Sequence, residues 1–297
     1  MTPRRILVIG DVMLDVVVKP MTAVAPTSDT PARIRLSRGG SAANMAVALA
    51  LTGHHVTFLG ASGDDVAAQL FEESLRDAGV RAALERVDAP TGVVVAMVGD
   101  DAQRAMLTDR GANPMLTMDH VLTQLERPFD HLHVSGYTFL DPTTRHVGTA
   151  ALARAATLRR PTSVDVCSVG PLAAVTPDVF RDAIKGTSTL FANEEEALLL
   201  SGESDVLSAM EALARDFGEV VVTRGVHGAR AQMGANAFEV PSLSDVVIDT
   251  TGAGDAATGA YLALRLSGSS MIDSLYGAMR AASEIVRGLG SRGQSRT

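Results

Sequence analysis

Short apolar runs alternate with segments of helical pattern from about residue 130 to the end of the chain. Four of these runs have the length and composition of buried strands, and they lie at 131–134, 163–166, 190–192 and 220–223. Helices are expected between them, at 143–157, 194–200 and 209–217. This alternation predicts a mostly parallel sheet with helices on both faces, because each parallel crossover carries a covering helix.

The N-terminal part of the chain begins in the same way but is interrupted twice. Strands are expected at 6–9 and 55–60, and helices at 44–51 and 64–78. Residues 12–38 and 90–110 instead have the extended, partly alternating pattern of hairpins. We expect these two segments to form a small β-sheet lid over a main α/β domain of residues 1–11, 39–89 and 111–297. Because an isolated small sheet leaves one face uncovered, we also expect a homodimer formed through the lid.

Composition excludes several classes of function. The formal net charge is −8 and no run of five basic residues occurs, which argues against nucleic acid as a partner. The single cysteine, Cys167, fits a reducing compartment. The longest apolar runs, such as 45–51, are too short to cross a membrane, and no signal-like segment follows Met1, so we expect a cytoplasmic protein without membrane partners.

The segment Asp249-Thr250-Thr251-Gly252-Ala253-Gly254-Asp255 carries the strongest chemical signal. It follows an apolar run at 246–248 and precedes a helical pattern, so a strand is expected to turn on two glycines into a helix. Small residues leave the first N–H groups of that helix accessible, and the helix dipole makes them a site for an anion such as phosphate. A carboxylate beside an anion site suits phosphoryl transfer to an alcohol, with Asp255 accepting the proton.

Three further segments carry residues suited to binding a ligand. Gly39-Gly40-Ser41-Ala42-Ala43-Asn44 opens the first long helix, and its glycines allow close approach to a polyol. Asn193 and Glu196 follow a strand and share one helix face, where they could hold a hydrated magnesium ion. The strand end at 220–225, with Gly228 after it, has the small residues expected beneath a nucleotide. No Gly-Lys-Ser/Thr occurs, so a Walker-type phosphate loop is excluded.

Together these motifs resemble the PfkB (ribokinase-like) family of ATP-dependent sugar and nucleoside kinases. Residues 39–44 are similar to the family's N-terminal signature, 249–255 to its C-terminal signature, and 193–196 to its Asn-x-x-Glu motif. The likeness covers nearly the whole chain. It implies an α/β fold, a ribokinase-like three-layer sandwich with a mostly parallel central sheet and a small β-sheet lid.

The resemblance also implies roles for individual residues on the acceptor side. Asp255 would be the base that deprotonates the acceptor hydroxyl. The backbone of Gly252, Ala253 and Gly254 would form the anion hole for the transferred phosphoryl group. Sugar hydroxyls would be bound by a set of residues from the N-terminal part of the chain: Asp11, Asp15, Gly39, Gly40 and Asn44.

For the nucleotide side, the resemblance implies a site built from Asn193, Thr223, Arg224, Gly225 and Gly228. Asn193 and Glu196 would organise Mg²⁺ through its waters. Asp249 and Thr251 match two positions of a monovalent-cation site, to which residues 288–291 could add carbonyls. ATP and Mg²⁺ are therefore the implied cofactors, and K⁺ is an implied activator.

The sequence leaves the acceptor open. Ser41 stands where ribokinases proper have lysine, which argues against ribose itself, and a ketose, pentose or sugar acid is expected. A nucleoside kinase of the adenosine type is the alternative, although aromatic residues for stacking a purine make up only 4% of the chain. A dinucleotide-binding dehydrogenase would need Gly-x-Gly-x-x-Gly after the first strand, and Gly10-Asp11-Val12 lacks it. A catalytically inactive sugar sensor is disfavoured by intact Asp255, Asn193 and Glu196.

Two histidines, the cysteine and one aspartate with chemically active side chains lie outside these motifs. His131 and His133 share one strand face without a third metal ligand nearby, and they are interpreted as ordinary strand histidines. Cys167 is interpreted as a packing residue, because no partner histidine or second cysteine accompanies it. Asp165, at the same strand end, either faces the cleft or caps a turn.

Overall fold

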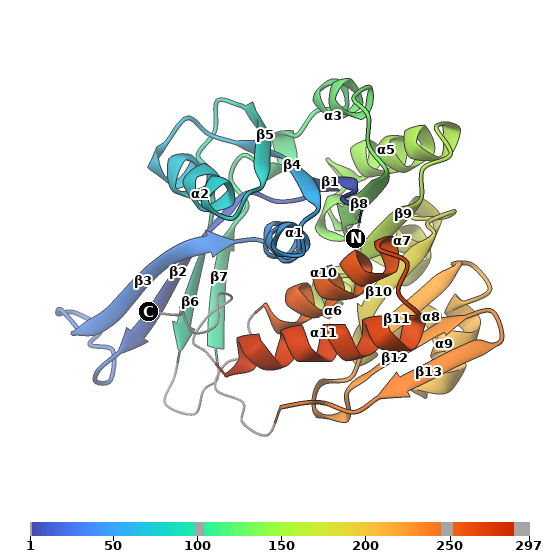
Figure 1. Ribbon diagram of the computed structural model, residues 1–297. Coiled ribbons are helices and arrows are strands. Elements are labelled where there is room, and N and C mark those ends of the chain that lie inside the picture. Colours follow the sequence, from blue (N-terminus) through green and yellow to red (C-terminus); the bar gives the residue numbers. More distant parts are fainter. Residues whose placement is uncertain (1, 99–103, 245–251, 288–297) are drawn as a thin grey trace.

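The structure, a computed structural model, describes residues 2–98, 104–244 and 252–287. Within them, nine strands form one large sheet in the order β13-β12-β11-β10-β9-β8-β1-β4-β5 (Figure 1). Their bounds are β1 Arg5–Ile9, β4 His55–Ser62, β5 Arg81–Arg86, β8 His131–Ser135, β9 Thr162–Asp165, β10 Thr189–Asn193, β11 Glu219–Thr223, β12 Ala229–Met233 and β13 Asn236–Val240. In this sheet the seven neighbouring strands β11, β10, β9, β8, β1, β4 and β5 run parallel to one another. The strands β12 and β13 add an antiparallel hairpin at the edge beside β11.

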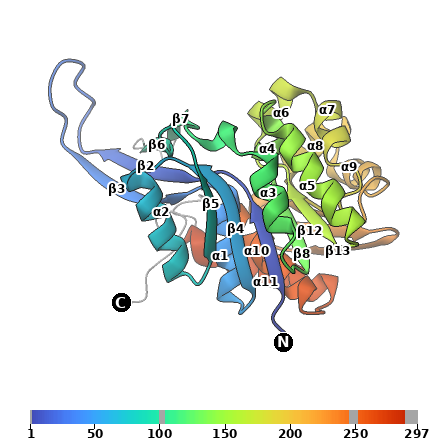
Figure 2. The ribbon, with the colours of Figure 1, turned by 90° about the horizontal axis from the view of Figure 1, so that it is seen from above.

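Helices cover both faces of this sheet, as the view from above shows (Figure 2). One core lies beneath α1, α2, α10 and α11, and a second core lies beneath the helices from α3 to α9. The helix bounds are α1 Ser41–Leu51, α2 Val66–Asp77, α3 Met118–Leu125, α4 Tyr137–Leu140, α5 Arg145–Thr157, α6 Val169–Val175, α7 Pro177–Ala183, α8 Glu194–Ser201, α9 Val206–Leu213, α10 Ala253–Leu266 and α11 Met271–Val286. Among the helices described, none is long and apolar enough to span a lipid bilayer.

A second, four-stranded sheet projects from the same molecule (Figure 1). Its order is β3-β2-β6-β7, with bounds β2 Met13–Pro20, β3 Ala32–Gly39, β6 Gly92–Val98 and β7 Arg104–Asp109. β2 is antiparallel to β3 and parallel to β6, and β6 is antiparallel to β7. This arrangement confirms the predicted α/β fold class, with a large mostly parallel sheet and a smaller separate one.

The predicted elements match the structure better in the middle of each segment than at its ends. The helix expected at 209–217 is wrong in its bounds, since α9 covers Val206–Leu213. The helix starts earlier in the chain than predicted, at Val206, because the side chain of Asp205 caps it. This side chain accepts hydrogen bonds from the N–H groups of Leu207 and Ser208, each at 3.0 Å. The strand β5, the hairpin β12–β13 and the helices α3, α4, α6, α7 and α11 were not predicted. The strand expected at 246–248 lies outside the described residues.

Asn113 joins the chain segments that cross between the two sheets. Its Oδ1 accepts a hydrogen bond from the N–H of Val12 at 2.7 Å, and its Nδ2 donates to the carbonyl oxygens of Val12 at 3.0 Å and Arg110 at 2.8 Å. Val12 leads into β2 and Arg110 leads out of β7, so one side chain fixes the two connections relative to each other. Asn113 is 3% exposed, and water therefore does not replace these bonds.

Replacement of Asn113 by alanine should destabilise the fold. The variant leaves the buried N–H and C=O of Val12 without the amide, and each unsatisfied group costs about 1–3 kcal/mol. We expect the free energy of unfolding in urea to fall by about 2–6 kcal/mol on this basis. Asn236→Ala, on the exposed strand β13, is the control and should change it by less than about 0.5 kcal/mol. An unchanged urea midpoint for Asn113→Ala would exclude the joining role.

Candidate functional site

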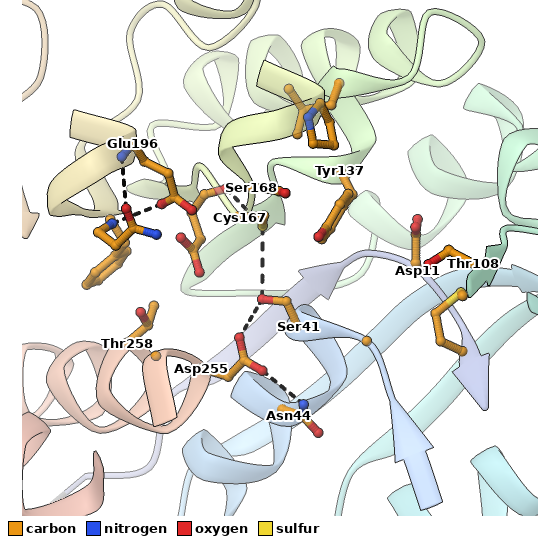
Figure 3. A pocket seen from close by; sticks show the side chains of 18 of the residues that line it. Asp11, Ser41, Asn44, Thr108, Tyr137, Cys167, Ser168, Glu196, Asp255 and Thr258 are labelled. Carbon is orange, nitrogen blue, oxygen red and sulfur yellow. Dashed lines mark hydrogen bonds between the residues drawn. The ribbon is translucent and has the colours of Figure 1, made fainter. Parts of the chain in front are cut away.

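A cavity of about 770 Å³ lies where five parallel strands of the large sheet end. Its walls come from the segments that follow β1, β8, β9, β10 and β11, which is where ligands bind in open α/β sheets. Val94, Met106 and Thr108 of the smaller sheet also line it. The cavity is therefore shared between the two sheets, and Figure 3 shows its side chains converging from several elements.

Helix α10 begins at this cavity. Gly252 precedes its first turn in the left-handed conformation, with φ 76° and ψ 2°, and as a glycine it brings no capping side chain of its own. Gly254 borders open space, since a Cβ atom built there would meet no heavy atom within 4 Å. The backbone N–H groups of the first turn therefore stay available to a ligand, in a 14-residue helix whose dipole favours an anion at this end.

Asp255 lies in that first turn and is held by the first turn of α1 (Figure 3). One carboxylate oxygen accepts a hydrogen bond from Ser41 Oγ at 2.6 Å, and the other accepts from Asn44 Nδ2 at 2.9 Å. Arg38 in turn donates to Asn44 Oδ1 at 2.9 Å, which fixes the orientation of the amide. Burial raises the pKa of Asp255, while the bonds from Ser41 and Asn44 and the charge of Arg38 oppose this rise.

Asp15, on β2, lies in the same electrostatic environment. Burial and the negative charge of Asp255 raise the pKa of Asp15 to about 6, and the charge of Arg38 opposes the rise. Gly39 leaves the space that this carboxylate occupies, because a Cβ atom there would collide with it. Gly40 has φ 88°, and a Cβ atom on it would lie 2.6 Å from the carbonyl oxygen of Asp11. Gly40 lines the cavity, whereas Gly39 only makes room for Asp15.

Asp11 is paired with a cation that the sequence analysis missed. Arg110 donates from Nε and Nη2 to the two oxygens of Asp11, at 3.0 and 2.8 Å, and from Nη1 to Asp141. All three residues line the cavity. Burial raises the pKa of Asp11 even though Arg110 opposes this. Only the position of Arg110, at the end of the predicted hairpin segment 90–110 and directly before Gly111, marked it in the sequence.

The predicted nucleotide-binding residues separate into two groups. Asn193, Glu196 and Thr223 line the cavity, and Asn193 and Thr223 are neighbours on the paired strands β10 and β11. Asn193 and Glu196 form a capping box on α8, with bonds of 2.8 and 2.9 Å between each side chain and the other residue's N–H. Burial raises the pKa of Glu196.

Arg224, Gly225 and Gly228 lie beyond the cavity wall. Arg224 forms ion pairs with Glu194 and Glu239, at 3.1 and 2.6 Å. Gly228 has φ 88°, and a Cβ atom there would collide with the carbonyl of Val240, so this glycine serves the turn from β11 into β12. A Cβ atom added to Gly225 would meet no heavy atom within 4 Å, so this glycine borders open space. These three residues form the surface next to the cavity rather than its lining.

Asp165 and Cys167, at the end of β9, face the cavity. Burial raises the pKa of Asp165 well above its ordinary value, and the negative charges of Glu196 and Asp255 add to this. Cys167 has φ 76°, and its sulfur lies 3.3 Å from Ser135 Oγ. The same sulfur lies 4.0 Å from Ser41 Oγ (Figure 3). Burial raises the pKa of the Cys167 thiol, which keeps it neutral. The interpretation of Cys167 as a packing residue therefore missed its place in the cavity wall.

Among the described residues, no group of three or more His, Cys, Asp or Glu side chains could enclose a metal ion. Both His131 and His133 bond to Ser163 Oγ, at 2.8 and 2.9 Å, and burial lowers the pKa of each to about 3. The buried Glu196 and the half-buried Asp165 offer carboxylate oxygens to the cavity, the ligand type that Mg²⁺ accepts when phosphates and water complete its shell. The predicted monovalent-cation residues Asp249 and Thr251, and the stretch 288–291, lie outside the described residues.

Comparison with known protein families gives one match over almost the entire chain. The profile of the pfkB family of carbohydrate kinases matches residues 3–297. An ATP-dependent ribose-1-phosphate kinase from Halopiger xanaduensis is 31% identical over 271 residues, which are 89% of this chain and 85% of that protein. The bifunctional protein HldE of Pseudomonas fluorescens is 28% identical over 96% of this chain, and the chain spans 60% of the length of HldE.

Solved structures agree on the fold. Adenosine kinase from Sinorhizobium meliloti gives a TM-score of 0.87 at 23% identity, covering 99% of this chain and 97% of that one. A putative ribokinase II from E. coli, in complex with ATP and Mg²⁺, gives a TM-score of 0.87 at 21% identity, covering 99% and 96%. At these identities the likeness establishes the ribokinase-like fold and nothing finer.

Replacement of Asp15 by asparagine should stabilise the protein at neutral pH. The raised pKa means that the folded state keeps a proton that the unfolded state has lost, so Asp15 costs stability as the pH rises from 3.8 through about 6. We expect the melting temperature of Asp15→Asn to exceed that of the wild type by the full amount above about pH 6, and the difference to shrink as the pH falls and to vanish below pH 3.8. Asp77→Asn, on the exposed end of α2, is the control. A difference in melting temperature that does not change with pH would contradict the raised pKa of Asp15.

Proposed function

Because the chain belongs to the pfkB family of carbohydrate kinases, and is therefore a phosphotransferase with a hydroxyl group as acceptor, we propose that it transfers the γ-phosphoryl group of ATP to a small carbohydrate. The observation that carries this proposal is the position of Asp255. It lies between the acceptor side of the cavity, near Asp11 and Thr108, and the side of Glu196 (Figure 3). The open N-terminus of α10 is next to it.

In this mechanism Asp255 accepts the proton of the attacking hydroxyl. Ser41 and Asn44 hold both of its oxygens, so the carboxylate is oriented before the acceptor binds. Phosphoryl transfer through a loose transition state needs little basicity, because the hydroxyl loses its proton late. Asn44, predicted to bind sugar, therefore acts first by positioning Asp255.

The backbone N–H groups of Gly252, Ala253 and Gly254 would stabilise the charge on the transferred phosphoryl group. Gly252 turns the chain into the helix in the left-handed conformation, and a glycine at this position has no side chain that would occupy these donors in place of the ligand. Donors fixed in place before the reaction stabilise developing charge without reorganising. This arrangement supports the predicted anion hole.

Binding of ATP with Mg²⁺ is proposed for the side of the cavity formed by Asn193, Glu196 and Thr223. Mg²⁺ carried by ATP would neutralise phosphate charge during transfer. The capping box fixes Glu196 Oε2, and the rest of that carboxylate and Asp165 face the cavity, where a cation would offset their burial. Arg224, Gly225 and Gly228 would border the nucleotide from outside the cavity. Activation by K⁺ through Asp249 and Thr251 stays a proposal.

Hydroxyl groups of the acceptor would be bound by Asp15, Asp11 and the backbone of Gly40. A nucleoside acceptor is the alternative, and its purine would need a flat aromatic partner. Among the described residues that line the acceptor side, Tyr137 is the one aromatic side chain, which favours a sugar. Steady-state assays with Mg²⁺ and K⁺ against sugars and nucleosides distinguish the two, and no turnover with any acceptor would contradict the kinase assignment.

Asp255→Asn and Asp255→Ala should lower kcat by about 10²–10⁴-fold, the usual contribution of a general base. Affinity for ATP, measured by calorimetry, should change little, because Asp255 is not among the proposed nucleotide contacts. Asp178→Asn, in the exposed first turn of α7, serves as the matched control. Turnover of the Asp255 variants within a few-fold of the wild type would overturn its assignment as the base.

We also propose that residues 12–38 and 90–110 act as a lid and form a homodimer contact. Strand register places Leu36, Val16, Val95 and Leu107 side by side on one face of the smaller sheet. Asp15 and its neighbours point to the opposite face, toward the cavity. Leu36 and Leu107 are 54% and 61% exposed, so an apolar face is left open to a second copy of the chain.

The double variant Leu36→Lys/Leu107→Lys should convert a dimer into a monomer, because four lysines would be buried in the shared face. Analytical ultracentrifugation at micromolar concentration measures the change. Leu51→Lys, on a leucine at the end of α1 that is 77% exposed, should leave the mass unchanged. A wild-type protein that sediments as a monomer would contradict the proposed contact.

A further inference from the structure

The acceptor side of the cavity is strongly acidic. Asp11, Asp15, Asp141 and Asp255 line it, and Arg110 is the one cation among the lining side chains that the structure describes. Arg38 lies behind Asn44, outside the lining, where its charge acts on Asp15 and Asp255. Neither of the two lysines of the sequence, Lys19 and Lys185, lines the cavity.

Arg110 is already neutralised by its neighbours. Nε and Nη2 are directed at the two oxygens of Asp11, and Nη1 is directed at Asp141. Asp141 is itself fixed, because its Oδ1 accepts hydrogen bonds from the N–H and the hydroxyl of Thr143, at 2.8 and 2.6 Å. The cation thus faces two carboxylates, and the local group Asp11–Arg110–Asp141 carries a net negative charge when all three are ionised.

Within the part of the lining that the structure describes, an anionic acceptor would meet no cation except Arg110, whose charge is already paired with two carboxylates. Like charges in a partly buried site repel strongly, because little water is present to screen them. Hydroxyl groups have the opposite preference, since they donate hydrogen bonds to carboxylates. The charges of the lining therefore favour neutral acceptors over anionic ones, whatever the shape of the acceptor.

We propose that the acceptor is an uncharged polyhydroxy compound, and that Asp141 helps to set this specificity by pairing with Arg110. Phosphorylated sugars and sugar acids are excluded by the same pairing. This inference rests on the proposed kinase function and narrows it, because the sugar acids expected from the sequence are removed. It also separates this chain from the ribose-1-phosphate kinase relative, whose name specifies an anionic acceptor.

Matched pairs of acceptors test the proposal on the wild-type enzyme. Each pair compares a neutral compound with its anionic counterpart: ribose with ribose 1-phosphate, fructose with fructose 1-phosphate, glucose with gluconate, and adenosine with its monophosphate. The acceptor with the highest kcat/KM should be neutral, and its anionic partner should be slower by about tenfold or more. A phosphorylated or acidic compound as the best acceptor would overturn the inference but keep the kinase, whereas no turnover of any member would remove the kinase as well.

Asp141→Asn tests the part played by the pairing. Asparagine retains an oxygen acceptor for Thr143 but releases one negative charge from Arg110. The ratio of kcat/KM for the anionic member to that for the neutral member should rise by about tenfold. Glu126→Gln removes a carboxylate from the remote Arg154 pair and should leave the ratio unchanged. An equal loss for both members of each pair would show a purely structural role for Asp141 and contradict the proposal.

Discussion

The contact between the first turns of α1 and α10 is the interaction on which the site depends. Ser41 and Asn44 bond to both oxygens of Asp255 across 214 and 211 residues of sequence. The two helices pack on the same face of the large sheet, within the core that contains Met45 and Tyr261. Burial of apolar side chains thus brings together two loops whose polar ends then form the cavity floor.

The same cavity concentrates negative charge that the fold must tolerate. Burial raises the pKa values of Asp11, Asp15, Asp165 and Glu196, which means that ionising them in the folded state is unfavourable. These carboxylates therefore do not stabilise the fold. Clusters of this kind are typical of functional sites, where the residues are needed for the reaction rather than for stability. Asp255 bears the same unfavourable cost of ionisation, and the bonds from Ser41 and Asn44 offset only part of it.

Periodicity identified the buried parallel strands because each is a short, nearly continuous apolar run. β8 to β11 and β1 were predicted within one or two residues for that reason. The hairpin β12–β13 was missed because its exposed outer strand mixes Asn236, Phe238 and Glu239 without a clear period. The start of α9 was misplaced because the buried stripe Val206, Ala209, Met210 and Leu213 begins directly after the capping residue Asp205, three residues before the predicted start.

The sequence by itself determined the fold class, the elements that carry the motifs, and the identities of Asp255, Asn193 and Glu196 as candidate site residues. These follow from local patterns: apolar runs, two glycines at a strand–helix turn, and an Asn and Glu three residues apart. Only the tertiary structure decided that Asn44 holds Asp255, that Arg224 pairs with Glu194 and Glu239, and that Arg110 joins Asp11 to Asp141. Such pairings connect residues that lie far apart in the chain, and the sheet order and helix packing that bring them together leave no signal in local sequence.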